Sequence, residues 1–451
     1  MDRQPSLFSG SIIFFSSSIV IILSRFATSI IVARALGVAG KGEYTLILTI
    51  NGLLILFLDL GLNSSIRYHV AGQRYATKEL FSFAILSSLT LSVIGGLLFY
   101  KMYLGSLSHN LLAGVHTEYI ILLILFLPIN LLTHYSSAII LGLYKIGQYN
   151  LVSIIRVIVN LILQIIAVKL GTGISGAIWA WIIANLVSSL VVLWMLRGDI
   201  LLTFHWQSRL AASSFSYGIK TYVANLLTFF NYRLDTFLVN MFSGLNSVGL
   251  YSISVATAEL IWYIPNSISE PLFLKSAADK SLTMSKTTAQ VNRQTLIVII
   301  PVTILFAIAS SFLIPWLYGS AFQAAVVPFL LLLPGIIGIT TSKLLFSNLS
   351  GSGMPQFATY SSAITVFTTI ILDFALIPWL DIIGAAIASS IAYLFGSILS
   401  LYWFKRETHI PWQEVIIPHS QDFIYLFHYG FGMLLNVSAR IRFVKKTPRE
   451  P

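Results

Sequence analysis

The sequence predicts an all-α integral membrane protein in which twelve transmembrane helices form two six-helix bundles. Three observations predict this fold class. Hydrophobic residues make up 57% of the 451 residues and charged residues only 10%, and the mean hydropathy of +0.86 is far above that of soluble globular chains. Many apolar runs reach roughly 20 residues, the length that crosses the hydrocarbon core as a helix. Two motifs also recur at nearly the same offset in the two halves of the chain.

Twelve apolar runs are long enough to span the membrane: residues 10–36, 44–66, 81–104, 118–143, 149–170, 174–196, 214–241, 248–274, 293–318, 325–349, 356–379 and 382–404. The first run lacks a small-residue cleavage site after a short apolar core, so we expect a retained span rather than a signal peptide. With the N-terminus in the cytoplasm, the opposite side keeps only Lys41, Lys101 and Lys169 of the Lys and Arg residues assigned to span ends and loops. This bias predicts that both termini are cytoplasmic.

The two halves of the chain repeat each other. The motif "GVAGKGEY", which begins at Gly37, recurs as "GLNSVGLY", which begins at Gly244, an offset of 207. The segment "ISGAIWAWIIANL" at 174–186 is similar to "IIGAAIASSIAYL" at 382–394, an offset of 208. Because six spans per half is an even number, both halves insert the same way up and are related by a pseudo-two-fold axis along the membrane normal. We therefore expect an N-terminal lobe at 1–196, a cytoplasmic linker at 197–213, a C-terminal lobe at 214–404 and a cytoplasmic tail at 405–451.

The tail contains an aromatic and apolar stretch, "QDFIYLFHYGFGMLLNV" at 421–437, which is too short to span the membrane. Basic residues follow it, namely Arg440, Arg442, Lys445 and Lys446. This pattern favours a helix lying on the cytoplasmic membrane surface, held by anionic lipid. A fraying end of the chain is the alternative.

Several classes of function are excluded or disfavoured by what the sequence lacks. The absence of cysteine excludes disulfides, thiolate catalysis and Cys-ligated metals. The eight histidines show no HExxH spacing, and no P-loop is present. The longest predicted outer loop, about 105–117, is too short to hold a catalytic domain. We therefore expect no enzyme, no metal and no cofactor, and the net charge of +11 is assigned to membrane orientation and not to nucleic acid.

Eleven ionisable residues lie inside the predicted spans, where charge is costly and usually faces a cavity or a partner. The cations are Arg25, Arg34, Arg156, Lys220, Arg233 and Lys343, and the anions are Asp59, Asp235, Glu259, Glu270 and Asp373. This near balance favours paired charges over a uniformly basic pore.

Arg25 and Arg34 need separate explanations, because nine helical steps of about 100° place them on opposite faces of the first span. Arg34 is close enough to the outer end to reach the headgroups, which indicates anchoring or packing between the lobes. Arg25 is about 16 Å from that end at 1.5 Å per residue and cannot reach water along the lipid. It is predicted either to bind phosphate in a cavity or to pair with Asp59 or Asp235.

Two other spans carry a polar face. Arg156, Asn160 and Gln164 recur at every fourth residue of the fifth span, which suits a hydroxyl-rich sugar or, alternatively, hydrogen bonds that hold the bundle together. The eighth span carries Glu259, Tyr263, Asn266 and Glu270 on one face. Glu259 and Asp235 either exchange a proton during transport or serve as fixed partners of a neighbouring Arg.

Several longer motifs resemble a known family. They are "ARALGVAGKGEY" at 33–44, "DLGLNSSIRYHVA" at 59–71, "NYRLDTFLVNMFSGLNSVGLYSISVA" at 231–256 and "GSGMPQFA" at 351–358. They resemble the polysaccharide-exporter branch of the MATE-like superfamily and, within it, the Wzx-type O-antigen or capsule flippases. The resemblance implies two six-helix bundles around a central cavity that opens alternately to each side. It also implies that the family commonly carries the residue types found here at Arg34, Asp59, Arg67, Asp235 and Tyr251.

The resemblance implies flipping of an undecaprenyl-pyrophosphate-linked oligosaccharide across the bacterial cytoplasmic membrane. The candidate substrate-binding residues are Arg25, Arg156, Asn160, Gln164, Lys220, Arg233 and Lys343. The candidate coupling carboxylates, for a proton or a sodium ion, are Asp59, Asp235 and Glu259. A polysaccharide polymerase and glycosyltransferases are the expected partners in the same process.

Two other functions compete with flipping. A MATE-type exporter of a small organic cation favours an acidic, aromatic pocket, whereas this chain has about as many cations as anions in its spans. A membrane enzyme, such as an oligosaccharide polymerase or acyltransferase, requires a large outer loop or a His-centred site. The sequence shows neither.

Overall fold

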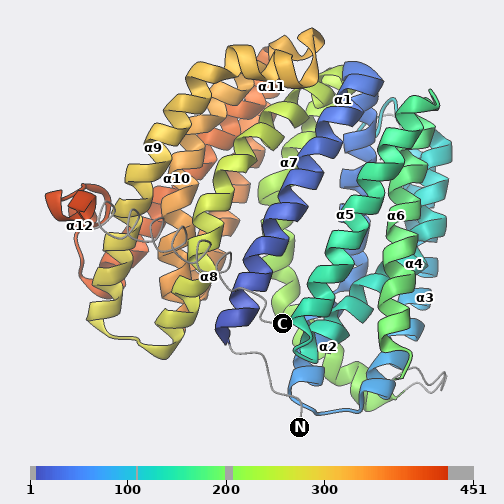
Figure 1. The fold of residues 1–451 in the computed structure, drawn as a ribbon, viewed down its shortest axis with the longest axis horizontal. Coiled ribbons are helices and arrows are strands. Elements are labelled where there is room, and N and C mark those ends of the chain that lie inside the picture. The colour runs from blue at the N-terminus through green and yellow to red at the C-terminus, as the bar shows by residue number, and fades with distance from the viewer. Residues whose placement is uncertain (1–6, 108–109, 199–206, 425–451) are drawn as a thin grey trace, which may run out of the picture. The chain divides into compact units, whose positions relative to one another are not determined.

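The computed structural model describes residues 7–107, 110–198 and 207–424, with residues 7–17 described by their backbone alone. Every regular element in these ranges is a helix, which confirms the all-α prediction (Figure 1). The elements are α1 (Leu7–Asp59), α2 (Leu62–Ala71), α3 (Thr77–Met102), the π-helix η1 (Tyr103–Leu107), α4 (Thr117–Gly142), α5 (Ile146–Lys169), α6 (Gly173–Leu196), α7 (Ser208–Glu259), the 3₁₀-helix η2 (Leu260–Trp262), α8 (Tyr263–Ala278), α9 (Leu282–Tyr318), the 3₁₀-helix η3 (Ser320–Ala325), α10 (Val326–Gly351), α11 (Gln356–Thr408) and α12 (Trp412–Ile416).

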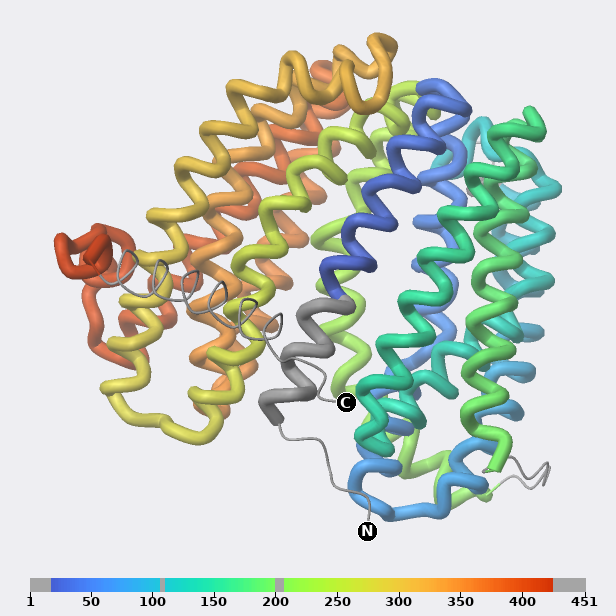
Figure 2. The backbone as a smooth tube through the Cα atoms, in the orientation of Figure 1, coloured from blue at the N-terminus to red at the C-terminus, as the bar shows by residue number. Residues whose placement is uncertain are grey.

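Within the described ranges, nine helical segments are long and apolar enough to cross a membrane. Three of them are interrupted in their interior by a residue with non-helical angles, namely Gly37 in α1, Gly244 in α7 and Asp381 in α11. Each of these residues lies between two of the predicted spans. In Figure 2 the tube of α1 reverses direction and forms two helical segments that run opposite ways. Helical structure continues on both sides of a single residue, so the segments are fewer than the predicted spans. The number twelve remains a prediction.

The sequence repeat extends to the backbone conformation. Gly37 has φ 67° and ψ −169°, and its repeat equivalent Gly244 has φ 79° and ψ −177°. Only glycine adopts such angles without a steric penalty at Cβ. Gly173 and Asp381, which are related by the offset of the second motif pair, also share a positive φ, of 61° and 52°. The two motif pairs found in the sequence therefore mark equivalent turns in the chain.

The two glycine turns pack against each other through their backbones. A Cβ atom at Gly42 would lie 1.9 Å from the Leu245 carbonyl oxygen, and one at Gly249 would lie 2.0 Å from the Val38 carbonyl oxygen. Gly42 and Gly249 are repeat equivalents, and so are Val38 and Leu245. The contact is therefore reciprocal, as expected at a local pseudo-two-fold axis. The end of the helices that carries these turns is the predicted outer end.

Side chains from these same turns bind carbonyl groups at the predicted outer end. The Arg34 guanidinium donates to the Leu317 oxygen at 2.7 Å and to the Trp316 oxygen, at the end of α9. The Asn240 amide donates to the oxygens of Leu111 and Ala113, at 3.0 and 3.1 Å. In each case a residue near the glycine turn satisfies backbone carbonyls in the last turn of a helix, or just after one, in the other half of the sequence.

The chain divides into two compact units, which are treated one at a time below. The first comprises Met1–Val255, Ser311–Phe329 and Val366–Ala388, and the second comprises Ala256–Ser310, Leu330–Thr365 and Ser389–Pro451. The outer segments of α9 and α11 belong to the first unit. This agrees with the hydrogen bonds from Arg34 to Leu317 on α9 and from Ser247 to Asp381 on α11. The division into lobes at 1–196 and 214–404, with a linker at 197–213, remains a prediction.

In the second unit, the segment after α11 is held by a buried ion pair. Arg293, at the predicted cytoplasmic end of α9, is 8% exposed, and its Nε donates to Asp422 Oδ2 at 2.6 Å. The same guanidinium donates to the Glu414 carbonyl, and the Asn292 amide donates to the Val415 carbonyl at 3.0 Å. Most of the predicted interfacial helix at 421–437 lies outside the described residues.

Candidate functional site

The candidate site begins at the C-terminal end of α1, in the helical segment that follows Gly37. Asp59 is the last residue of α1, and Gly61, with φ 76°, begins the turn into α2. The Asp59 carboxylate accepts hydrogen bonds from the backbone N–H groups of Gly61 at 3.1 Å and Asn63 at 2.9 Å. A carboxylate is favoured at a helix N-terminus because the first N–H groups lack partners within the helix. Asp59 is thereby fixed in place and is only 6% exposed.

His134 on α4 faces this carboxylate. Its Nε2 lies 3.7 Å from Asp59 Oδ1, an ion-pair distance rather than a hydrogen bond. The Asn63 side chain donates to the His134 carbonyl at 2.8 Å, which ties α2 to α4 at this point. The His134 side chain is 41% exposed, whereas that of Asp59 is 8% exposed. The pair therefore has one buried member and one accessible member.

Two arginines complete the arrangement. Arg156 on α5 is near enough to Arg25 on α1 for their like charges to repel. Its positive charge also acts on the imidazole of His134. Within the described residues, neither Arg25 nor Arg156 forms an ion pair with a carboxylate. The alternative in which Arg25 pairs with Asp59 or Asp235 is therefore not seen. We call Arg25, His134 and Arg156, together with Asp59, the basic cluster.

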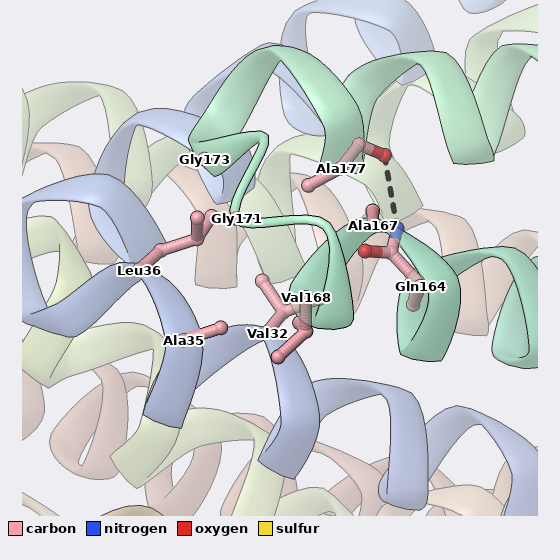
Figure 3. Close-up of a pocket in the computed structure, with 9 residues that line it drawn as sticks. All are labelled: Val32, Ala35, Leu36, Gln164, Ala167, Val168, Gly171, Gly173 and Ala177. Atoms are coloured by element: carbon pink, nitrogen blue, oxygen red, sulfur yellow. Dashed lines mark hydrogen bonds between the residues drawn. The ribbon is translucent and has the colours of Figure 1, made fainter.

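Asn160 and Gln164 lie on the same helix as Arg156, but Gln164 is buried whereas Asn160 is half-buried. Gln164 is 1% exposed, and its amide nitrogen donates to the Ala177 carbonyl at 2.9 Å and to the Tyr44 hydroxyl at 3.3 Å. It lines a cavity of about 180 Å³ between α1, α5 and α6, whose other walls are apolar (Figure 3). A sugar-binding role for Asn160 and Gln164 remains a prediction. Their observed bonds are of the kind that hold helices together.

The first unit also contains two buried acids, on α7 and α11. Asp235 is 5% exposed and accepts a hydrogen bond from the Tyr251 hydroxyl at 2.6 Å. Asp373 is fully buried, and neither of its oxygens has a hydrogen-bond partner among the described residues. The negative charges of the two residues act on each other. We call Asp235 and Asp373 the acid pair.

The acid pair has a neutral counterpart in the other half of the sequence. Tyr251 and Tyr44 are repeat equivalents, and Tyr44 contacts the Gln164 amide instead of a carboxylate. The repeat thus places carboxylates on one side of the pseudo-symmetry and amides on the other.

Lys343 and Glu259, predicted to bind substrate and to couple ions, come together in the second unit. The Lys343 ammonium donates to the Asn266 side-chain oxygen at 2.7 Å and lies 4.6 Å from the centre of the Trp262 ring. The charge of Glu259 also acts on it. The short 3₁₀-helix η2 interrupts the α-helical structure here. The two remaining predicted cations, Lys220 and Arg233, lie on α7, the first exposed and the second half-buried.

His134 and Asp373 are the two residues that the sequence did not select as site residues. The histidine stands alone in its span, and the two members of the acid pair are far apart along the chain. No local spacing could have signalled either. In the part of the chain that the structure describes, no group of three or more His, Asp or Glu side chains could hold a metal ion.

Comparisons with known proteins place the chain in a family. Residues 31–327 match the family model described as polysaccharide biosynthesis protein. A putative O-antigen transporter of Shigella flexneri is 24% identical over 386 residues, which cover 83% of this chain and 92% of that protein. An uncharacterized membrane protein of Methanocaldococcus jannaschii is 27% identical over 204 residues, which cover 44% of this chain and 40% of that protein.

Solved structures share the fold. The lipid II flippase MurJ in an inward closed conformation has a TM-score of 0.69 at 16% identity, covering 97% of this chain and 99% of that one. An inward-facing multidrug resistance MATE family transporter of the MOP superfamily has a TM-score of 0.68 at 15% identity, covering 88% and 98%. These likenesses confirm the MATE-like architecture. With the family match over most of the sequence, they show that the chain belongs to the polysaccharide biosynthesis protein family and confirm the predicted resemblance.

Proposed function

We propose that the protein flips an undecaprenyl-pyrophosphate-linked oligosaccharide across the bacterial cytoplasmic membrane by alternating access. The family match and the relative that is a putative O-antigen transporter support this function. The observation that carries it is the pair of neighbouring arginines, Arg25 and Arg156, that has no carboxylate partner within the described residues. An anionic group in the transported molecule would supply the missing counter-charge.

A pyrophosphate fits this pair better than other anions do. Two like charges in a membrane-spanning bundle are unfavourable unless a negative charge compensates them. A guanidinium binds a phosphate through two parallel hydrogen bonds, and a pyrophosphate offers one phosphate to each arginine. The sugars would then contact polar side chains of the cavity, with Asn160, Gln164, Lys220, Arg233 and Lys343 as the candidates. The polyprenyl tail stays in the lipid.

The acid pair is the proposed site for a coupling proton or sodium ion. A buried carboxylate without a hydrogen-bond partner is costly, and a bound cation or proton removes that cost. Asp373 has no such partner in the described structure, whereas Asp59 faces His134 and Glu259 faces Lys343. Of the three predicted coupling carboxylates, Asp235 is therefore the best choice, together with Asp373, which the sequence did not select.

The remaining parts of the proposal concern location and partners. The protein acts in the inner membrane with both termini in the cytoplasm, as the distribution of Lys and Arg favours. It works as a transporter and not as an enzyme, between glycosyltransferases that build the oligosaccharide and a polymerase that uses it. Export of a small organic cation by a MATE-type mechanism is less supported, because the accessible charges of the first unit at this site are basic.

Export of surface polysaccharide tests the proposal. Arg25→Ala or Arg156→Ala should abolish export while the protein stays in the membrane, because each removes a charge-assisted contact, a weakening of about tenfold or more. Arg25→Lys keeps the positive charge but cannot form the two parallel hydrogen bonds of a guanidinium, so export should be partial. Lys169→Ala is the matched control, since it removes an exposed cation from the same helix as Arg156. Normal export by a well-expressed Arg25→Ala variant would contradict the proposal.

A further inference from the structure

We propose that His134 is a third cationic contact for the pyrophosphate and that it takes up one proton as the substrate binds. This inference rests on the proposed function and extends it. In this proposal Asp59 is the carboxylate that stabilises the positive charge of the His134 imidazolium. The proton passes from a hydronium ion or a buffer acid in the solvent to the imidazole Nδ1: the bond between the proton and its donor breaks as the N–H bond forms, and the donor leaves as water or as the conjugate base.

The geometry favours a protonated ring when a phosphate oxygen binds at His134. Nε2 lies 3.7 Å from Asp59 Oδ1, an ion-pair distance, and Nδ1 forms no hydrogen bond with any described residue. A neutral imidazole carries one N–H, so it attracts an anion on one side only. The imidazolium attracts Asp59 and a phosphate oxygen at the same time.

Loss of solvent around the ring opposes a proton on His134 before the substrate binds, and the negative charges of the substrate favour it afterwards. Among the described residues, Asp59 is the acid beside the ring, and Arg156, which is itself close to Arg25, disfavours a further positive charge. The two arginines and Asp59 leave one positive charge in the empty site. A pyrophosphate diester brings two negative charges, which leaves one negative charge in the loaded site. One proton on His134 then makes the site neutral.

The other groups facing the ring suit this role less well. Both oxygens of Asp59 accept backbone N–H hydrogen bonds, which favour its charged form. The phenols near the cluster, Tyr135 on α4 and Tyr222 on α7, already carry their proton and have no basic nitrogen to accept another. His134 is accessible, with 41% of its side chain exposed. It is therefore the group that responds to the substrate.

Calorimetry on the full-length protein tests this inference. The probe is a short polyprenyl-pyrophosphoryl-N-acetylglucosamine, whose two phosphates each keep a single charge near neutral pH, so any proton uptake belongs to the protein. Titration in two buffers of different ionisation enthalpy should give an uptake of about one proton per ligand above about pH 7, where a free imidazole is mostly neutral. The affinity should fall about tenfold per pH unit in that range, as one linked proton requires.

Two variants separate the proton from the charge. His134→Gln should bind more weakly and show no proton uptake. His134→Arg carries a permanent charge, so it should restore most of the affinity with a flat pH profile and again no uptake. Tight binding by the wild type without proton uptake would overturn the inference and leave the flippase proposal intact. Absence of binding by the wild type at every pH would instead count against the proposed function.

Discussion

The reciprocal contact of the glycine turns makes a sharp prediction about closure of the outer end. In Gly249→Ala, the added Cβ would lie 2.0 Å from the Val38 oxygen, so the two turns must separate until this distance reaches the 3.4 Å at which ordinary contacts begin. The obstacle is backbone rather than a flexible side chain, so local rotation cannot relieve it. Overpacking of this kind costs about 1–3 kcal/mol. The cost applies to the closed arrangement only, which shifts the equilibrium towards opening by roughly 5- to 150-fold.

Thiol labelling measures this shift, because the chain contains no cysteine. Val248, which is 1% exposed beside the turn, is replaced by cysteine as the only thiol and is treated with a membrane-impermeant reagent from the outer side. Labelling should be slow with Gly249 and faster by about the same factor in Gly249→Ala. Gly147→Ala is the control, since a Cβ there meets nothing within 4 Å. Equal labelling rates for Gly249 and Gly249→Ala would refute the role of the contact in closure.

Three further predictions follow from ionic contacts. The hydrogen bond to Glu43, at 2.6 Å, raises the pKa of His116. The contribution of this bond to stability should therefore be complete below about pH 6.5 and should disappear as the pH rises through the raised pKa. The melting temperatures of the wild type and of His116→Ala should converge at alkaline pH. Arg293→Ala leaves Asp422 buried without its partner and should destabilise the second unit by about 3–5 kcal/mol, and adding Asp422→Asn should recover part of the melting temperature. Asp373→Asn removes a buried carboxyl group that has no hydrogen-bond partner among the described residues, so the melting temperature should hold or rise while any dependence of transport on a sodium or proton gradient is lost. Retained dependence would mean that the coupling ion binds elsewhere.

The sequence predicted features that depend on length, composition or local conformation. Run lengths predicted the helical membrane class, and the repeated glycine motifs predicted equivalent turns, because a positive φ at Gly37 and Gly244 is a local requirement. That Arg25 cannot reach water along the lipid also rests on its position along one helix, and it stays a prediction. Each of these inferences uses a single stretch of chain.

Features that join several helices were not predicted. Periodicity shows which residues share a face, but it does not show which neighbour that face meets. The approach of His134 to Asp59 joins α4 to α1, and the acid pair joins α7 to α11. Arg293 is the first residue of a predicted span, and its position along the chain did not show that its side chain is buried against Asp422. The amide face of α5 illustrates the same limit, because Gln164 shares a face with Arg156 yet is packed against Ala177.

Transbilayer movement of a pyrophosphate-linked lipid oligosaccharide in liposomes tests the central claim most directly. The purified full-length protein is reconstituted, and the fraction of a fluorescent lipid-linked oligosaccharide in the outer leaflet is followed with an impermeant quencher. The account predicts that the wild type speeds this movement and that the double variant Arg25→Ala, Arg156→Ala does not, while both insert normally into the membrane. It also predicts no acceleration for the monophosphate analogue beyond a small fraction of that rate, since one phosphate cannot engage both arginines. A wild-type protein that leaves the leaflet distribution unchanged, or a double variant as fast as the wild type, would contradict it.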